Sequence, residues 1–329
     1  MQDARTEQDL LIETFDGRAR RRENRRAFFT AALGVAAVGG AFAYADPALA
    51  QTSVTDSDVL NFALNLEYLE AQFYLYAANG TGLTSDLTAS GGNTAGGTVT
   101  GGAQVDFTTD PLVGAYAREI AADELAHVKF LRTALGTAAV AMPNINISGA
   151  ADGPFTAAAL AAGVITSGAF NPYASPTDFL LGAFIFEDVG VTAYKGAAPL
   201  LSNKTFLEAA AGILAVEAYH AAIVRTTLYS KGVQGLIDAT EKIAAARDSL
   251  DGAPTEDKVR GIAPNDDQGI APSGSGDTLT ANLSPLNSNG LAFSRTPGQV
   301  LNIVYLNPGT ATMGGFFPNG VNGNIKSTT

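Results

Sequence analysis

Cysteine and tryptophan are absent from this 329-residue chain, and histidine occurs only twice. Without cysteine the protein can form no disulfide, no thiolate zinc site and no cysteine nucleophile. Any metal ion would therefore bind to aspartate, glutamate or histidine side chains. Basic residues are in the minority, 20 against 32 acidic ones, which gives a formal charge of −12. Such a surface repels nucleic acid, so we expect no nucleic-acid partner.

Apolar and small residues, by contrast, are abundant. Hydrophobic residues make up 46% of the chain, and glycine occupies 36 positions. A chain of this length and composition can bury a well-packed core. The mixture is typical of close-packed helices joined by glycine-bearing loops.

The first fifty residues have the layout of an export signal. Arginines concentrate in residues 18–26, the weakly apolar run 27–45 follows, and small residues precede an expected cleavage site after Ala50. Residues 25–29, R-R-A-F-F, resemble the twin-arginine signal. We therefore expect a mature protein that is periplasmic or secreted and has no membrane anchor. A permanent transmembrane helix is the alternative, but three glycines dilute the apolar run and no stop-transfer charges follow it.

Apolar residues at helical spacing, with capping residues and prolines at the starts, predict four long helices in the mature chain. The first covers 57–79, the second 110–136 and the third about 177–202, and the fourth follows at once and ends near 231. A shorter fifth helix is expected at 236–250.

The segments between and after these helices are rich in turn-forming residues. Residues 80–109 predict an inserted loop or a ragged hairpin, and residues 137–176 predict a long crossover with one short helical piece near 155–162. Proline, glycine, asparagine and serine dominate after Asp251. We expect this tail to be extended and packed on the helices, with the apolar run 300–306 as a strand-like piece.

Both histidines follow a glutamate by three residues, and both pairs fall within predicted helices. The pairs are Glu124 with His127 and Glu217 with His220. Residues i and i+3 share one face of a helix, so the carboxylate and the imidazole of each pair can bind the same metal ion or adjacent ions.

The two remaining long helices each place a glutamate in an apolar stripe, at Glu67 and Glu187. Glu187 and Glu217 stand equally far from Ser202 in the predicted turn, so an antiparallel pair of helices would bring them face to face. Buried carboxylates are costly unless they are protonated or neutralised by cations. Four carboxylates balance two divalent ions, and oxygen and imidazole donors suit iron or manganese, with zinc not excluded.

Several neighbouring residues compete for roles at this site. Glu70 is an alternative to Glu67, although the seven-residue step from Glu67 to Tyr74 resembles the Glu-to-Tyr spacing in ferritin helices, and this resemblance favours Glu67. Three acidic residues close to the ligands in sequence are expected to be solvated or to join helices rather than to support a metal: Glu119, Asp123 and Asp188. Three tyrosines are expected either to hydrogen-bond to ligands or to pack: Tyr74, Tyr194 and Tyr219.

The order and spacing of these residues, with the long crossover after the second helix, resemble the ferritin-like di-metal carboxylate proteins. More narrowly, segments such as L-N-F-A-L-N-L-E-Y-L-E-A-Q-F-Y and R-T-P-G-Q-V-L-N-I-V-Y look like the desiccation-related ferritin-like family of bacteria and plants. The resemblance implies an all-α, ferritin-like four-helix bundle. It also implies terminal or bridging ligands at Glu67 and Glu187, bridges at Glu124 and Glu217, and one imidazole per ion from His127 and His220.

The predicted organisation is a signal peptide at 1–50, a helical bundle at 51–250 and an irregular tail at 251–329. Two functions fit it. The first is a redox enzyme of stress protection whose two ions react with dioxygen or peroxide, as in ferroxidase-like or catalase-like chemistry. The second is a non-catalytic metal-binding or desiccation-protection protein in which the ions neutralise buried carboxylates. Bundles of this class often associate through their outer faces, which leaves a homo-oligomer open.

Overall fold

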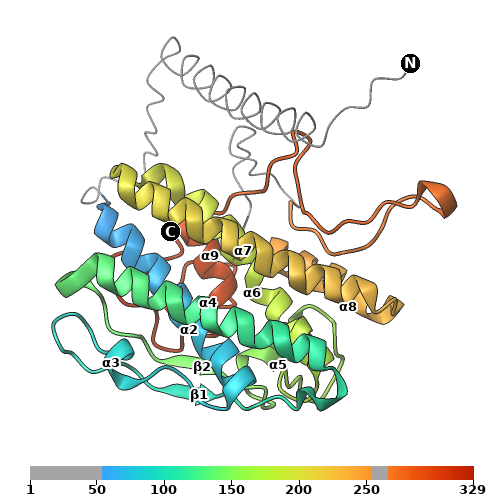
Figure 1. Cartoon of the computed structure of the whole chain (residues 1–329), viewed down its shortest axis with the longest axis horizontal. Coiled ribbons are helices and arrows are strands. Elements are labelled where there is room, and N and C mark those ends of the chain that lie inside the picture. Colours follow the sequence, from blue (N-terminus) through green and yellow to red (C-terminus); the bar gives the residue numbers. More distant parts are fainter. Residues whose placement is uncertain (1–53, 253–265) are drawn as a thin grey trace, which may run out of the picture. The chain divides into compact units, whose positions relative to one another are not determined.

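The computed structural model describes residues 54–252 and 266–329, which form a mostly helical unit (Figure 1). The expected export signal and its cleavage site lie outside these residues. Four long helices dominate the described part of the chain, and they are α2 (Asp56–Asn79), α4 (Pro111–Leu135), α6 (Pro176–Ala197) and α7 (Lys204–Ser230). The most extensive packing joins α2 to α4 and α6 to α7.

Side-chain caps and prolines set the starts of these helices. Thr55 and Asp58 form a reciprocal capping box at the start of α2, and Asp110 caps α4 just before Pro111. Gly80 ends α2 in the left-handed conformation, with φ of +74°, which glycine adopts without steric cost. The observed boundaries of α2 and α4 lie within one residue of the predicted ones.

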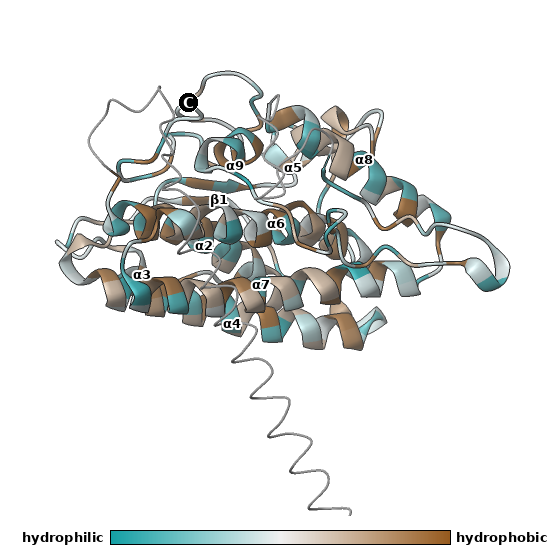
Figure 2. Ribbon diagram, turned by 90° about the horizontal axis from the view of Figure 1, so that it is seen from above, coloured by the Kyte–Doolittle hydropathy of each residue, from teal (hydrophilic) through white to brown (hydrophobic). Residues whose placement is uncertain are grey.

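The inner helices α2 and α6 are buried on nearly all sides, whereas α4 and α7 bury only one face each. The cover over α2 and α6 comes from α5 (Pro154–Ala161), α8 (Gln234–Leu250), the two short strands and the C-terminal segment (Figure 2). Among the described helices, α7 alone is long and apolar enough to cross a membrane. One face of α7 packs against α6.

The segment between α2 and α4, predicted as an inserted loop or a ragged hairpin, is largely irregular, and its one strand pairs outside the segment. It contains a short helix, α3 (Ser85–Thr88), and one strand, β1 (Val99–Gly101). This strand pairs in parallel with β2 (Ile145–Ile147) from the long crossover. Because each strand is only three residues long and its partner lies far along the chain, composition alone could not indicate the pairing.

The apolar run 300–306 was predicted wrongly as a strand-like piece, because most of it lies in helix α9 (Pro297–Val304). A short continuous apolar run does not distinguish a strand from a buried helix. The local signals at its start decide in favour of the helix: Thr296 and Gln299 form a capping box, and Pro297 occupies the first helical position.

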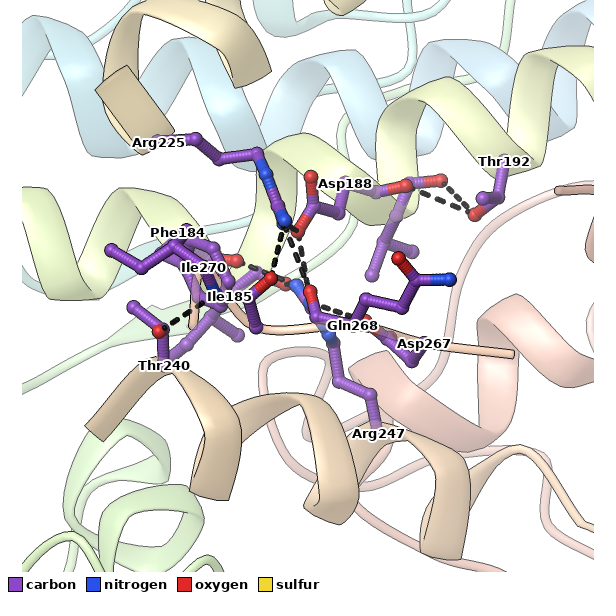
Figure 3. A network of polar contacts seen from close by, with 12 residues as sticks. Phe184, Ile185, Asp188, Thr192, Arg225, Thr240, Arg247, Asp267, Gln268 and Ile270 are labelled. Atoms are coloured by element: carbon purple, nitrogen blue, oxygen red, sulfur yellow. Dashed lines mark hydrogen bonds and ion pairs between the residues drawn. The ribbon is translucent and has the colours of Figure 1, made fainter. Parts of the chain in front are cut away.

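A buried network of alternating charges fastens the C-terminal segment to the bundle (Figure 3). Asp188 Oδ2 on α6 accepts hydrogen bonds from Arg225 on α7 at 2.8 Å and from Arg247 on α8 at 2.9 Å. Asp267 then joins Arg247, at 2.6 Å, to Arg295, at 2.7 Å. Each buried charge thus meets at least one opposite charge, which offsets its desolvation. We call these five residues the tail network.

Candidate metal centre

Six side chains that the sequence singled out converge in the interior between the four long helices. None is more than 8% exposed. Potential donor atoms within each of two overlapping groups lie within 4.8 Å of one another. The first group contains Glu67, Glu124, His127 and Glu217, and the second contains Glu187, Glu217 and His220.

Both imidazoles present Nδ1 to this cluster. His127 Nδ1 lies 3.2 Å from Glu67 Oε2, 3.6 Å from Glu124 Oε2 and 3.8 Å from Glu217 Oε1. His220 Nδ1 lies 3.1 Å from Glu124 Oε1 and 3.7 Å from Glu187 Oε2. Glu124 therefore turns one oxygen toward each histidine, and Glu217 belongs to both groups. These two carboxylates occupy the places from which a ligand could reach two ions.

Two tyrosines fix the outer oxygens of the remaining glutamates. The Tyr74 hydroxyl on α2 donates to Glu187 Oε1 on α6, and the Tyr194 hydroxyl on α6 donates to Glu67 Oε1 on α2. Burial, together with the nearby carboxylates, raises the pKa of both phenols well above its usual value, so both remain donors. The third tyrosine, Tyr219, is 71% exposed and points to solvent.

The structure places Asp123 beside His220, whereas the sequence favoured a solvated or helix-joining role for this residue. Its Oδ2 lies 3.2 Å from Nε2 of His220, the ring nitrogen that faces away from Glu124. A carboxylate at Nε2 favours the tautomer with the proton there and leaves Nδ1 free to bind a metal. The pair joins α4 to α7 across 97 residues, and no spacing rule links positions so far apart. Glu119 is exposed, and Asp188 belongs to the tail network.

Several inward-facing atoms of the cluster lie close to one another but form no hydrogen bonds within the described residues. Both oxygens of Glu124, Oε2 of Glu187, Oε2 of Glu217 and Nδ1 of His220 accept or donate no hydrogen bond there. Buried polar atoms without a hydrogen bond are rare in proteins, and they call for a proton, an ordered water molecule or a bound ion. Carboxylate oxygens and imidazole nitrogens are donors that suit divalent iron, manganese or zinc. The residues therefore fit a metal centre.

The protonation of the metal-free cluster reflects its low polarity and crowded charge. Burial raises the pKa of Glu67 to about 7 and that of Glu187 to about 8. Burial also raises the pKa of Glu217 well above its usual value, and neighbouring carboxylates raise it further. Burial acts in the same direction on Glu124, but the two imidazoles, whose Nδ1 atoms lie 3.6 Å and 3.1 Å from its oxygens, outweigh the effect of burial and lower that pKa to about 2. A divalent cation would relieve this repulsion.

Both alternatives on α2 lie inside the bundle. Glu67 contributes a donor atom to the first group, and Glu70, which is 7% exposed, lies one helical turn further along. Burial raises the pKa of Glu70 well above its usual value, and Glu124, Glu187 and Glu67 raise it further. The structure thus brings Glu70 close to the cluster in addition to Glu67.

Comparison with known proteins agrees with this geometry. The sequence profile of the ferritin-like domain matches residues 55–230, which span all four long helices. The ferritin-like catalase Nec2 of Nesocodon mauritianus is 30% identical over 82% of this chain and 84% of its own. The desiccation-related protein PCC13-62 of Craterostigma plantagineum is 28% identical over 75% of this chain and 76% of its own. No solved structure matches the chain.

Proposed function

The chain belongs to the ferritin-like family, and we propose that its buried glutamates and histidines bind two iron or manganese ions that decompose hydrogen peroxide. The observation that carries the proposal is the set of buried carboxylate and imidazole atoms that form no hydrogen bond in the described residues. The relative named as a ferritin-like catalase supports peroxide as the substrate. Protection of the cell envelope from oxidants is the corresponding role.

Six residues form the proposed ligand set. Glu124, which faces both histidines, and Glu217, which belongs to both groups of donor atoms, would hold the ions together with His127 and His220. Glu67 and Glu187 complete the two halves. Four carboxylates carry four negative charges, which two divalent ions neutralise, so the centre as a whole is electrically balanced.

The chain itself positions these side chains and buries them. Redox-active ions in this site would supply the two-electron chemistry by which one peroxide is reduced and another is oxidised. Tyr74 donates a hydrogen bond to one oxygen of Glu187, and Tyr194 donates one to an oxygen of Glu67. The second oxygen of each glutamate remains directed toward the cluster. Asp123 holds the His220 ring. The near-complete burial of the cluster restricts access to small molecules such as peroxide or dioxygen.

Metal analysis of the purified protein, followed by assays of oxygen release from peroxide and of ferrous-ion oxidation, tests the proposal. We expect iron or manganese at two ions per chain and release of oxygen. Glu124→Ala and His220→Ala should each lose metal, whereas Glu119→Ala, at an exposed position, should not. Equal metal content in all three variants would overturn the ligand assignment.

A non-catalytic role is the second candidate, and the similarity to a desiccation-related protein favours it. In that case the ions serve only to neutralise the buried carboxylates and hold the bundle together. Redox-silent zinc with no turnover of peroxide or ferrous ion would select this candidate. Ferrous oxidation without oxygen release would instead indicate ferroxidase-like chemistry.

We also propose export through the twin-arginine pathway, with removal of residues 1–50 and a periplasmic or secreted mature protein. The support is the order of arginines, apolar run and small residues in the sequence. N-terminal sequencing of the exported protein should find Gln51 first. A chain that begins before Phe28 would retain the apolar run and contradict cleavage.

A further inference from the structure

The two halves of the proposed centre repeat one pattern of residues. In each half, one helix carries a glutamate followed by a tyrosine seven residues later, and its partner helix carries a glutamate followed by a histidine three residues later. The first half consists of Glu67, Tyr74, Glu124 and His127, and the second consists of Glu187, Tyr194, Glu217 and His220.

The crossed hydrogen bonds fix the register between α2 and α6. Tyr74 reaches Glu187, and Tyr194 reaches Glu67, so the two helices run in opposite directions past each other. The residues midway between these contacts lie level with one another. On α2 the midpoint falls at Glu70 and Ala71, and on α6 it falls at Gly190 and Val191.

The repeat is broken at this midpoint. Three residues after Glu67 stands Glu70, and three residues after Glu187 stands Gly190. Positions i, i+3 and i+7 share a helical face, so both residues lie on the faces that carry the cluster. The α2 half has an additional carboxylate where the α6 half has no side chain.

Space at Gly190 is taken up by two carboxylates. A Cβ atom built on Gly190 would overlap Glu217 Oε2 and would lie 3.6 Å from Glu70 Oε1. Both carboxylates therefore approach the same stretch of α6 backbone, and the absence of a Cβ atom at Gly190 leaves room for that of Glu217, with Glu70 in contact distance beside it. Glu70 Oε2 is buried without a hydrogen-bond partner in the described residues, and so is Glu217 Oε2. An isolated buried carboxylate of this kind requires a proton or a cation.

We infer that Glu70 is a seventh metal-binding side chain, which joins Glu217 in the space left by Gly190 and adds a carboxylate to the centre. This inference rests on the proposed metal centre. The ion that Glu70 reaches has one more carboxylate than the repeat alone would give it. The otherwise matched halves therefore bind their ions unequally.

Calorimetric titration of the metal-free protein with Mn²⁺, combined with thermal melting, tests this role. Glu70→Gln keeps the shape of the side chain but removes the charge. We expect its affinity for at least one ion to fall about tenfold or more. Without metal, the same variant should melt at or above the wild-type temperature, because it replaces a buried carboxyl group whose Oε2 has no hydrogen-bond partner in the described residues by a neutral amide of the same shape. A purely structural role would lower that temperature and leave the affinity unchanged.

Two further variants keep the outcomes separate. Glu119→Gln, on the exposed side of α4, should change neither affinity nor melting. Gly190→Ala should weaken Mn²⁺ binding by displacing Glu217, whose Oε2 would overlap the added Cβ atom. Wild-type affinity in Glu70→Gln would overturn the inference and leave the proposed centre intact. If the wild-type protein itself bound no Mn²⁺, Fe²⁺ or Zn²⁺, the centre and the inference would both be wrong.

Discussion

Asp123 Oδ2, at the end of a side chain that is 43% exposed, lies 3.2 Å from Nε2 of the buried His220. The opposite nitrogen of the same ring lies 3.1 Å from Glu124 Oε1. A surface carboxylate on α4 therefore orients an imidazole on α7 toward the centre of the bundle. Asp123 directly precedes Glu124, and in the other half of the cluster Val216 directly precedes Glu217. Valine cannot accept a hydrogen bond from an imidazole through its side chain, so this position supports His220 but offers no equivalent contact to His127.

Replacing Asp123 by asparagine should weaken metal binding without unfolding the protein. The amide can place either a donor or an acceptor at Nε2, so the favoured tautomer of His220 is lost. Loss of such a supporting contact typically lowers metal affinity about 10- to 100-fold. Titration with Mn²⁺ measures the effect, and Glu119→Gln on the same helix is the matched control. Unchanged affinity in Asp123→Asn would show that the contact does not orient the ring.

The Tyr194 and Tyr74 hydroxyls should stabilise the fold even without metal. Tyr194→Phe leaves Glu67 Oε1 buried without its donor, and an unmet buried hydrogen-bonding group costs about 1–3 kcal/mol. Denaturant unfolding of the metal-free protein should show a loss of that size, and Tyr74→Phe should behave alike. Tyr219→Phe, at an exposed position, should change stability by less than about 0.5 kcal/mol. Equal stability of all three would contradict the buried hydrogen bonds.

Metal should stabilise the protein more strongly as the pH rises. The folded, metal-free protein has the pKa of Glu67 raised to about 7 and that of Glu187 to about 8, from 4.5. Carboxylates raise the pKa of His220 from 6.5 to about 9, despite its burial. The stability that these groups contribute is full below their unfolded pKa and is lost as pH rises through the folded values. The metal-free protein should therefore weaken from about pH 5 to pH 9.

Metal binding has the opposite pH dependence, because metal replaces the protons on these carboxylates and imidazoles. The difference in melting temperature between metal-bound and metal-free protein should grow between about pH 6 and pH 9. Calorimetric melting of both forms at several pH values provides the measurement. A difference that shrinks with rising pH would show that metal does not displace protons from this cluster.

The tail network should contribute to stability far more than a surface ion pair. Asp267→Ala removes the carboxylate that Arg247 and Arg295 share. Breaking a buried ion pair in this way costs about 3–5 kcal/mol of stability. Lys231→Met is the matched control, because its partner Asp110 is also partly exposed and such pairs contribute about 1 kcal/mol or less. Denaturant unfolding distinguishes the two. Similar small losses in both variants would contradict the burial of the network.

The sequence predicted the helical scaffold well, because its signals are local. Caps and prolines such as Thr55, Asp110 and Pro111 mark helix starts within the residues that form them. The two Glu-x-x-His pairs were visible for the same reason, since spacing of three places both side chains on one face. The structure brings those four residues together with Glu67 and Glu187 in a single cluster.

Features that depend on pairing between distant segments were not predictable. The strands β1 and β2 are too short to show a pattern, and the helix α9 carries an apolar run that also suits a strand. Asp123 gave no sign that it would meet His220, and Asp188 gave none that it would bind arginines from two other helices. Each of these contacts exists only once the bundle has formed.

Anomalous X-ray scattering at the iron, manganese and zinc edges, measured on crystals of the protein purified with its native metal, tests the central claim most directly. We predict two iron or manganese peaks about 3.5–4 Å apart, surrounded by the glutamates and histidines of the four long helices. Crystals of well-folded protein with no anomalous peak inside the bundle, even after soaking with Mn²⁺ or Fe²⁺, would contradict it.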